Sequence, residues 1–400
     1  MLDGFRRHEA SEHYERAIAL ERVGRVDEAI VEYRRAVDVD PGFAAAYEAL
    51  GHHYQRLGLL VKARDAFQTV AQLEGDYTAH FNLGYILVEL EAHEEALQSF
   101  QKCLALTPND PSALYEVGYV QYALEHFTEA LEALRIPQEA YAGDWRVHSL
   151  VGACFLGLGQ WEQAEKSYRQ AMETAALPEE MEEARSGLST AQRYQEFPVC
   201  SAMELKDHAY ADAGVVFLGT LGDDGLQIPV RSDPTLTPEE VAVTVHRLRV
   251  LVESLGLPLT AVVAVDRISA PLVAAVSRAL SLPQKGWSHL RGEDRPLLVL
   301  AANRQPGLME IALEQARGRP LTFILALSGY GENTFLPDLV GVPARGTCTL
   351  PWERPGEEEE GDGAGTEALL RVCFNPPPDP TLEAQIRYYV SEHRLLRFLE

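Results

Sequence analysis

The first half of the chain repeats one arrangement of small and apolar residues about every 34 positions. In each unit a small residue is followed twelve positions later by an alanine, and a large side chain follows that alanine by four positions. A period in this range is typical of a solenoid, in which stacked units bury one continuous core. The five pairs are Ala17/Ala29, Gly51/Ala63, Gly84/Ala96, Gly118/Ala130 and Gly152/Ala164.

Helix-breaking residues divide each unit into two helices. Gly24, Gly58 and Gly159 follow the small residue by seven positions, where a first helix must end and the chain must turn back. Pro41 and Pro108 close the first and third units. We therefore expect a helix, a turn and a second helix in each unit. The small residues then let the two helices approach closely.

The second unit shows the pattern most completely, through Tyr47, Leu50, Gly51, Tyr54, Gly58, Ala63 and Phe67. This pattern resembles the tetratricopeptide repeat (TPR) family, and the resemblance implies a superhelix of helix-turn-helix repeats. Residues 178–197 are polar and are expected to form a capping helix. In the fourth repeat Leu134 replaces the aromatic residue, and the second helix is expected to end near Pro137. The five repeats are expected at residues 10–43, 44–76, 77–110, 111–144 and 145–178.

Beyond Phe197 and Pro198 the period stops, and short apolar runs alternate with helical segments. Near-continuous apolar strands that alternate with helices predict a mostly parallel sheet covered on both faces. We expect strands at residues 214–221, 226–230, 260–265, 296–302, 321–327 and 368–375. We expect helices at residues 237–255, 270–282, 306–318 and 381–399.

The predicted fold therefore has two domains. Residues 1–197 form an all-α TPR superhelix of five repeats with a capping helix. Residues 198–400 form an α/β domain with a mostly parallel sheet. This domain contains an acidic loop at 354–366, which we expect to be solvated rather than a cation site.

Polar side chains follow the ends of three predicted strands. Ligands of parallel sheets bind beyond the carboxyl ends of the strands, so these side chains are candidates for a ligand pocket. The two arginines among them suit an anion. The alternative is a set of ordinary strand-to-helix turns with polar caps. The candidate pocket residues are Asp266, Arg267, Ser269, Asn303, Arg304 and Ser328.

Residues 258–328 also resemble the type I phosphoribosyltransferases, through TAVVAVDRISAPLVAAVSRALSLP and the following LLVLAANRQPGLM. The resemblance implies that two acidic residues after the second strand anchor ribose hydroxyls, and that the next loop holds the 5′-phosphate. Here Ala301 and Ala302 occupy the two acidic positions, and residues 303–307 replace the hydroxyl-rich loop. The resemblance therefore implies a phosphoribosyltransferase-like domain that is degenerate in its chemistry.

The first helix of each repeat lines the inner surface in the TPR architecture. In the third and fourth repeats the inward positions are largely aromatic, and in the second repeat they are more polar. Aromatic side chains with polar tips on a concave surface favour recognition of a peptide or a helix. The alternative is that some of these rings pack inside the superhelix or against the second domain. The candidate groove residues are His52, Arg56, Phe81, Tyr85, Tyr115, Tyr119 and Tyr122.

The formal net charge of the chain is −25, which disfavours nucleic acid and anionic membranes as partners. The five cysteines form no close pair, so we expect reduced, buried thiols. The sequence shows no apolar leader and no run of about 18 apolar residues, which predicts a cytoplasmic protein. It also lacks a phosphate-loop, a dinucleotide-binding and a nucleophile-elbow motif. We expect no cofactor, no metal and no catalytic residue.

These observations favour an adaptor or scaffold that binds a segment of a partner protein in the TPR groove, with a non-catalytic α/β domain. The alternative is an enzyme or sensor that binds a phosphosugar or nucleotide and is recruited through its repeats. A third interpretation is a structural subunit of a larger assembly. The sequence leaves the partner and the oligomeric state open.

Overall fold

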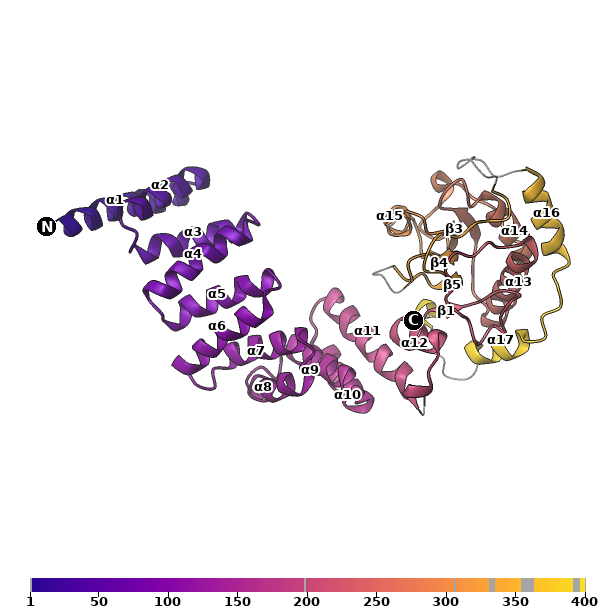
Figure 1. Cartoon of the computed structure of the whole chain (residues 1–400), viewed down its shortest axis with the longest axis horizontal. Coiled ribbons are helices and arrows are strands. Elements are labelled where there is room, and N and C mark those ends of the chain that lie inside the picture. Colours follow the sequence, from indigo (N-terminus) through magenta and orange to yellow (C-terminus); the bar gives the residue numbers. More distant parts are fainter. Residues whose placement is uncertain are drawn as a thin grey trace. The chain divides into compact units, whose positions relative to one another are not determined.

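The computed structural model describes residues 2–197, 199–305, 307–330, 335–353, 363–390 and 396–399. The chain packs into two units, Met1–Leu188 and Ser189–Glu400 (Figure 1). The division falls within helix α11 (Pro178–Gln195), upstream of the predicted domain boundary at residue 197. Residues 354–362, most of the predicted acidic loop, lie outside the described residues.

The first unit consists of successive helical hairpins, as the repeat period predicts (Figure 1). Two helices form each repeat and a further helix follows the fifth, so the predicted superhelix is confirmed. The helices are α1 (Leu2–Arg22), α2 (Val26–Val39), α3 (Ala44–Arg56), α4 (Leu60–Leu73), α5 (Tyr77–Glu89), α6 (His93–Leu106), α7 (Pro111–Ala123), α8 (Phe127–Ala140), α9 (Trp145–Gly157), α10 (Trp161–Thr174) and α11 (Pro178–Gln195).

Helix α8 corrects one expectation for the fourth repeat. It does not end near Pro137 but continues to Ala140. Because Pro137 lies in the last turn, its missing N–H removes a single backbone hydrogen bond. The turn is still held, since the backbone N of Tyr141 donates to the carbonyl of Pro137 at 2.8 Å.

The small residues of the repeats face the large residues of the same repeats. A Cβ atom added to Gly51 would lie 2.7 Å from the ring of Phe67, and one added to Gly84 would lie 2.8 Å from the ring of Phe100. The alanine of every pair is fully buried. The repeated residues therefore act as the sequence predicts, because a larger residue at the glycine would push the two helices of the hairpin apart.

The second unit is built on a parallel sheet (Figure 1), and the strand order among the described residues is β1-β5-β4-β3-β2. Leu297 and Val299 of β3 pack with α13, α14, α16 and α17, whereas Leu298 and Leu300 pack with α12 and α15. The predicted parallel sheet with two covered faces is confirmed. The strands are β1 (Val216–Phe217), β2 (Ala261–Ala264), β3 (Pro296–Ala302), β4 (Leu321–Leu327) and β5 (Leu339–Pro343). The α-helices are α12 (Leu205–Ala213), α13 (Pro238–Leu255), α14 (Ala270–Leu280), α15 (Leu308–Gln315), α16 (Gly363–Phe374) and α17 (Leu382–Val390).

Two predicted strands of this unit are wrong. Residues 226–230 form no strand, because the Asp224 carboxylate accepts hydrogen bonds from the backbone N of Leu226 and Gln227 at 2.9 and 2.5 Å. That turn takes the donors that a strand would use. Residues 368–375 lie almost entirely in helix α16, whose Leu369 packs into the core.

Two further expectations change in extent. The strand predicted at 214–221 is reduced to β1, Val216–Phe217. The helix predicted at 381–399 is represented by α17 and by a short 3₁₀ helix, Arg397–Leu399. Residues 391–395 between them lie outside the described residues.

A buried ionic cluster joins α13 to two loops of the second unit. Arg247 on α13 donates from Nη1 to Asp223 Oδ1 at 2.9 Å and from Nε to Asp379 Oδ2 at 2.7 Å. The exposed fractions of the three side chains are 1, 3 and 4% for Arg247, Asp223 and Asp379. The cluster therefore fastens the loop after β1 and the start of α17 to the core. Asp223 serves this structural purpose.

Candidate functional site

The first helices of the repeats carry the residues that the sequence places on the inner surface. A hollow of about 520 Å³ lies between α1 and α3, and we call it the α1–α3 hollow. It contains two predicted groove residues, His52 and Arg56. The remaining lining residues are Tyr14, Ile18, Glu21, Tyr33, Ala45, Glu48, Ala49, His53 and Gln55.

Glu21 organises one wall of this hollow. Its carboxylate accepts a hydrogen bond from the Tyr33 hydroxyl at 2.5 Å and lies 2.6 Å from Nε2 of His53. Arg56 Nη2 lies 2.8 Å from Nδ1 of the same His53 ring and 3.7 Å from Glu21. Arg56 can only donate, so Nδ1 accepts and Nε2 carries the proton of a neutral imidazole. Burial lowers the pKa of His53, in agreement with that neutral form.

A second carboxylate of the hollow, Glu48, has no such partner. It makes no hydrogen bond or ion pair with any residue that the structure describes, whereas Glu21 and Arg56 are engaged with each other and with His53. Burial raises the pKa of Tyr14, and the charge of Glu48 raises it further. The exposed His52 ring lies edge-on to Phe67, with ring centroids 5.0 Å apart. The hollow therefore offers an unneutralised negative charge beside an accessible imidazole.

The predicted aromatic residues of the third and fourth repeats fall into two groups. Tyr85 and Tyr119 are 45 and 39% exposed, and each directly follows the small glycine of its repeat. Phe81 instead stacks on Tyr77, with ring centroids 5.6 Å apart, and meets the Phe100 ring edge-on. The exposed pair is thus available to a ligand, and Phe81 contributes to packing.

The other two predicted rings are partly buried. Tyr122 contacts the Phe127 ring, with centroids 5.9 Å apart. Burial raises the pKa of Tyr115 to about 12 and also raises that of Tyr122. Both hydroxyls are therefore protonated at neutral pH and can act as hydrogen-bond donors.

One polar residue of this region, Glu116, is not among the predicted groove residues; it lies on α7 between Tyr115 and Tyr119. Its side chain is partly buried, without a hydrogen-bonding or ionic partner among the described residues. Burial alone raises its pKa to about 7. A charged residue inside an otherwise aromatic segment of the repeat was the signal in the sequence that could have revealed it.

The residues of the predicted anion pocket lie at the carboxyl edge of the sheet, but their polar groups bond mainly to the fold itself. Asp266 Oδ1 accepts from the backbone N and the hydroxyl of Ser269 at 2.8 and 2.5 Å. The same Ser269 hydroxyl accepts from the backbone N of Ala301 at 2.8 Å. Arg304 pairs with Glu353 at 2.5 Å. These contacts resemble the capped turns that formed the alternative interpretation.

The other members of this set remain accessible or unpaired. The Arg267 side chain is exposed, and Asn303 follows β3 at the edge of the sheet. The hydroxyl oxygen of Ser328 is buried without a hydrogen-bond partner among the described residues. An anion pocket at this edge stays a prediction.

The part of the chain that the structure describes contains no group of three His, Cys, Asp or Glu side chains placed to hold a metal ion. Within that same part, no helix combines the length and the apolar character needed to cross a membrane.

Comparison with known proteins places repeats in the first unit. The family model described as TPR repeat matches residues 23–58 and 84–125, and the one described as tetratricopeptide repeat matches residues 147–182. These matches lie upstream of residues 258–328, and the comparisons give no support to the resemblance of that segment to the phosphoribosyltransferases. No curated protein matches the chain.

Several solved structures are similar to part of the chain. A MamA protein shares 22% identity at a TM-score of 0.40, covering 42% of this chain and 98% of its own. YrrB, described as a TPR protein with an unusual peptide-binding site, shares 22% identity at a TM-score of 0.40, covering 43% of this chain and 90% of its own. A thermophilic TPR protein of Thermus thermophilus shares 19% identity at a TM-score of 0.34, covering 45% of this chain and 98% of its own. The matches to the two family models show that the first unit of the chain carries tetratricopeptide repeats.

Proposed function

We propose that the chain is a protein-interaction adaptor that binds a segment of a partner protein along the first helices of its repeats. The observation that carries the proposal is the exposure of Tyr85 and Tyr119 at the same position of two adjacent repeats. His52 occupies the same position one repeat earlier and is also exposed. Accessible rings at repeating positions suit an elongated ligand, which contacts several repeats in turn.

The charges on these helices favour a basic partner segment. Glu48 in the α1–α3 hollow has no ionic partner among the described residues, and the one guanidinium of the hollow, on Arg56, is committed to Glu21 and His53. A lysine or arginine of the ligand would neutralise Glu48, and its apolar or aromatic residues would pack on Tyr85 and Tyr119. An acidic segment would face repulsion at Glu48.

The second unit is proposed to have no catalytic role. Two of the three charged residues of the candidate pocket at the carboxyl edge, Asp266 and Arg304, are bonded within the fold. The alternative of a phosphosugar or nucleotide sensor at that edge therefore has the weaker support.

Panning a random peptide library on the purified full chain tests the proposal. We expect the enriched peptides to combine a basic residue with aromatic or large apolar residues. The Tyr85→Ala/Tyr119→Ala variant should lose most of this binding, and Glu48→Gln should weaken it and reduce its salt dependence.

The control variant is Val61→Ala/Leu73→Ala, which removes two similarly exposed apolar side chains from α4, a second helix. It should bind the selected peptides as the native chain does. Enrichment of acidic peptides, or equal binding by the tyrosine variant at an unchanged melting temperature, would contradict the proposal.

A further inference from the structure

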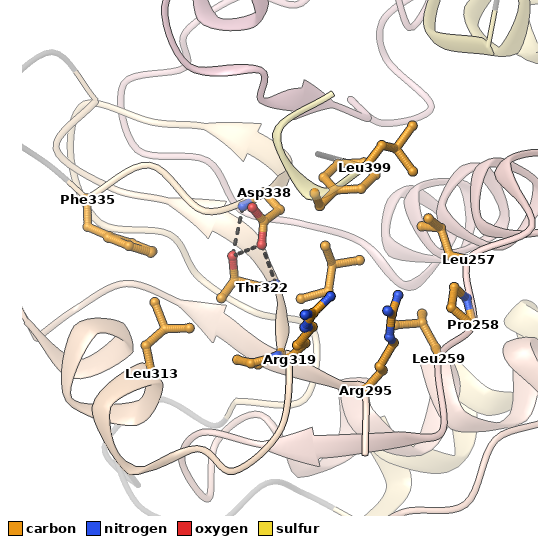
Figure 2. Close-up of a pocket in the computed structure, with 13 residues that line it drawn as sticks. Leu257, Pro258, Leu259, Arg295, Leu313, Arg319, Thr322, Phe335, Asp338 and Leu399 are labelled. Carbon is orange, nitrogen blue, oxygen red and sulfur yellow. Dashed lines mark hydrogen bonds between the residues drawn. The ribbon is translucent and has the colours of Figure 1, made fainter. Parts of the chain in front are cut away.

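A cavity of about 540 Å³ opens at the amino ends of strands β2, β3 and β4 in the second unit (Figure 2). This edge of the sheet is opposite to the carboxyl edge, where the predicted anion-pocket residues lie. The volume falls in the range of about 300–1,000 Å³ that small-molecule pockets occupy. Much of the wall is apolar, and its apolar residues include Leu257, Leu259, Leu313, Phe335 and Leu399.

Two arginines stand side by side on this wall, and Figure 2 shows both side chains extending into the cavity. Arg295 precedes β3 and Arg319 precedes β4. Leu297 and Leu321 are paired in the parallel register of these strands, and each arginine lies two residues before its leucine. Because side chains alternate along a strand, the two arginines continue one row of the sheet on one face.

The backbone holds both arginines firmly in this place. Arg295 N donates to Thr260 Oγ1 at 3.0 Å, and the carbonyl of Arg295 accepts from Thr260 N at 3.0 Å. Arg319 N donates to the carbonyl of Asp294 at 3.1 Å. Gly318 permits this contact, because a Cβ atom there would lie 2.0 Å from that carbonyl oxygen.

Asp294 also fixes the loop that carries Arg295. Its carboxylate accepts hydrogen bonds from Lys285 Nζ at 2.7 Å, from the backbone N of Arg291 at 2.8 Å and from the Thr260 hydroxyl at 3.1 Å. The rim of the cavity is therefore a preorganised structure, and its carboxylate is already neutralised by Lys285.

The two guanidinium groups lack a counter-charge among the described residues. Neither makes an ion pair or a hydrogen bond through its side chain with any of them. The acidic residue of the cavity wall, Asp338, is buried and accepts from the backbone N and the hydroxyl of Thr322 at 2.8 and 2.7 Å. Two like charges on neighbouring strands repel each other, so an anion between them relieves an unfavourable interaction.

We propose that this cavity binds an organic anion that joins a phosphate or carboxylate head to an apolar body. The head lies between the guanidinium groups of Arg295 and Arg319, which suit the oxygens of either group. The apolar body covers Leu257, Leu259 and Leu399. A cationic ligand is excluded by the two arginines, and a small inorganic anion leaves the apolar wall exposed to water.

Isothermal titration calorimetry of the purified full chain tests this site with decyl phosphate and decanoate, each kept below its micelle concentration. Inorganic phosphate, decanol and decyltrimethylammonium are the comparison ligands. We expect one or both decyl anions to bind, and the three comparison ligands to bind at least about tenfold more weakly. The stronger of the two anions identifies the head group.

Arg295→Met and Arg319→Met keep the apolar stem of the side chain and remove its charge. Each should weaken binding about tenfold or more, as expected for the loss of a charge-assisted hydrogen bond. The matched control is Arg317→Met, which alters an exposed arginine of the same loop that does not line the cavity. It should bind as the native chain does.

Three results would overturn the proposal: no binding of either decyl anion at about 1 mM, equal binding of decyltrimethylammonium, or equal weakening by Arg317→Met. The melting temperature provides a test that does not depend on the ligand. Because the two charges repel, Arg319→Met should leave it unchanged or raise it at low salt. A clear fall would show that the arginine has a structural partner and would likewise overturn the proposal.

Discussion

Replacing Arg247 by methionine should destabilise the second unit strongly. The variant removes the guanidinium that lies between Asp223 and Asp379, whose side chains are only 3 and 4% exposed. Two buried carboxylates then lose their cation. Breaking a buried ion pair from one side costs about 3–5 kcal/mol. In a domain of this size each kcal/mol lowers the melting temperature by about 2–4 °C, so a fall of roughly 6–20 °C is expected.

Differential scanning calorimetry and near-ultraviolet circular dichroism measure this effect, the latter because Trp352 of the same unit is buried. Arg371→Met is the control, since its exposed guanidinium pairs with Glu367 at 3.5 Å one helical turn away. That change should alter stability by less than about 0.5 kcal/mol. Adding Asp379→Asn to the Arg247 variant should recover part of the loss, because one buried charge is removed.

The effect of Arg247→Met should also depend on pH. Burial acts to raise the pKa of Asp379, but hydrogen bonds from Arg247 and Thr381 hold that pKa below its usual value in the native fold. The ionised Asp379 carboxylate therefore stabilises the native chain above its unfolded pKa of about 3.9. This stabilisation is lost as the pH falls through the pKa of Asp379 in the folded chain. Without Arg247, burial raises the pKa of the orphaned carboxyl, which acid then protonates and neutralises.

The difference in free energy of unfolding between native and variant chains should therefore shrink as the pH is lowered from about 7 to about 4. A difference that stays constant over this range would refute the reasoning. So would a loss of less than about 1 kcal/mol at neutral pH, because the cluster would then contribute no more than an exposed ion pair.

Two further changes test other parts of the chain. Burial raises the pKa of Glu116 to about 7, so its folded form holds a proton more tightly than its unfolded form, and stability should fall as pH rises from about 4.5 to 7. The free energy of unfolding in urea should therefore be lower at about pH 8 than at about pH 5, and Glu116→Gln should reduce this difference by roughly 2 kcal/mol. An unchanged difference would show that Glu116 does not cause the pH dependence. A Cβ atom on Gly341 would lie 2.4 Å from the carbonyl oxygen of Leu325, so Gly341→Ala should cost at least about 2 kcal/mol in thermal unfolding. Gly292→Ala, which meets no atom within 4 Å, should cost less than about 0.5 kcal/mol, and equal melting of the two variants would contradict the steric argument.

The first unit could be predicted in detail because one pattern occurs five times. Four of the five occurrences place a glycine against the large residue of the same repeat, as Gly51 against Phe67, so the positions of the helices follow from the spacing. The second unit offers no such repetition. Strand β5 was missed because Gly341 and Pro343 interrupt its apolar run, and these residues usually mark a loop. Gly341 is required there by the close approach of β4, which the sequence does not show.

The partners of the candidate site residues were harder to predict than their positions. The repeat register places Arg56 and Glu48 on the first helix of the second repeat, as expected. It does not show that Arg56 pairs with Glu21, one repeat earlier, so that Glu48 has no ionic partner among the described residues. Similarly, the sequence indicates Arg304 as a ligand for an anion, but in the folded chain Arg304 pairs with Glu353, which lies 49 residues further along the sequence. Pairing of charges depends on side-chain distances that only the tertiary structure provides.

The net charge of −25 disfavours polyanionic partners, but it does not disfavour small anions. At physiological ionic strength, charges interact strongly only within about 8 Å. A nucleic acid or a membrane samples a wide surface and experiences the overall charge. A single phosphate or carboxylate between Arg295 and Arg319 experiences chiefly those two guanidinium groups, because Lys285 neutralises Asp294 and the Asp338 carboxylate is directed to the backbone N and hydroxyl of Thr322. An acidic protein can therefore repel polyanions and still hold a small organic anion, provided that its fold separates two arginines from the surrounding carboxylates.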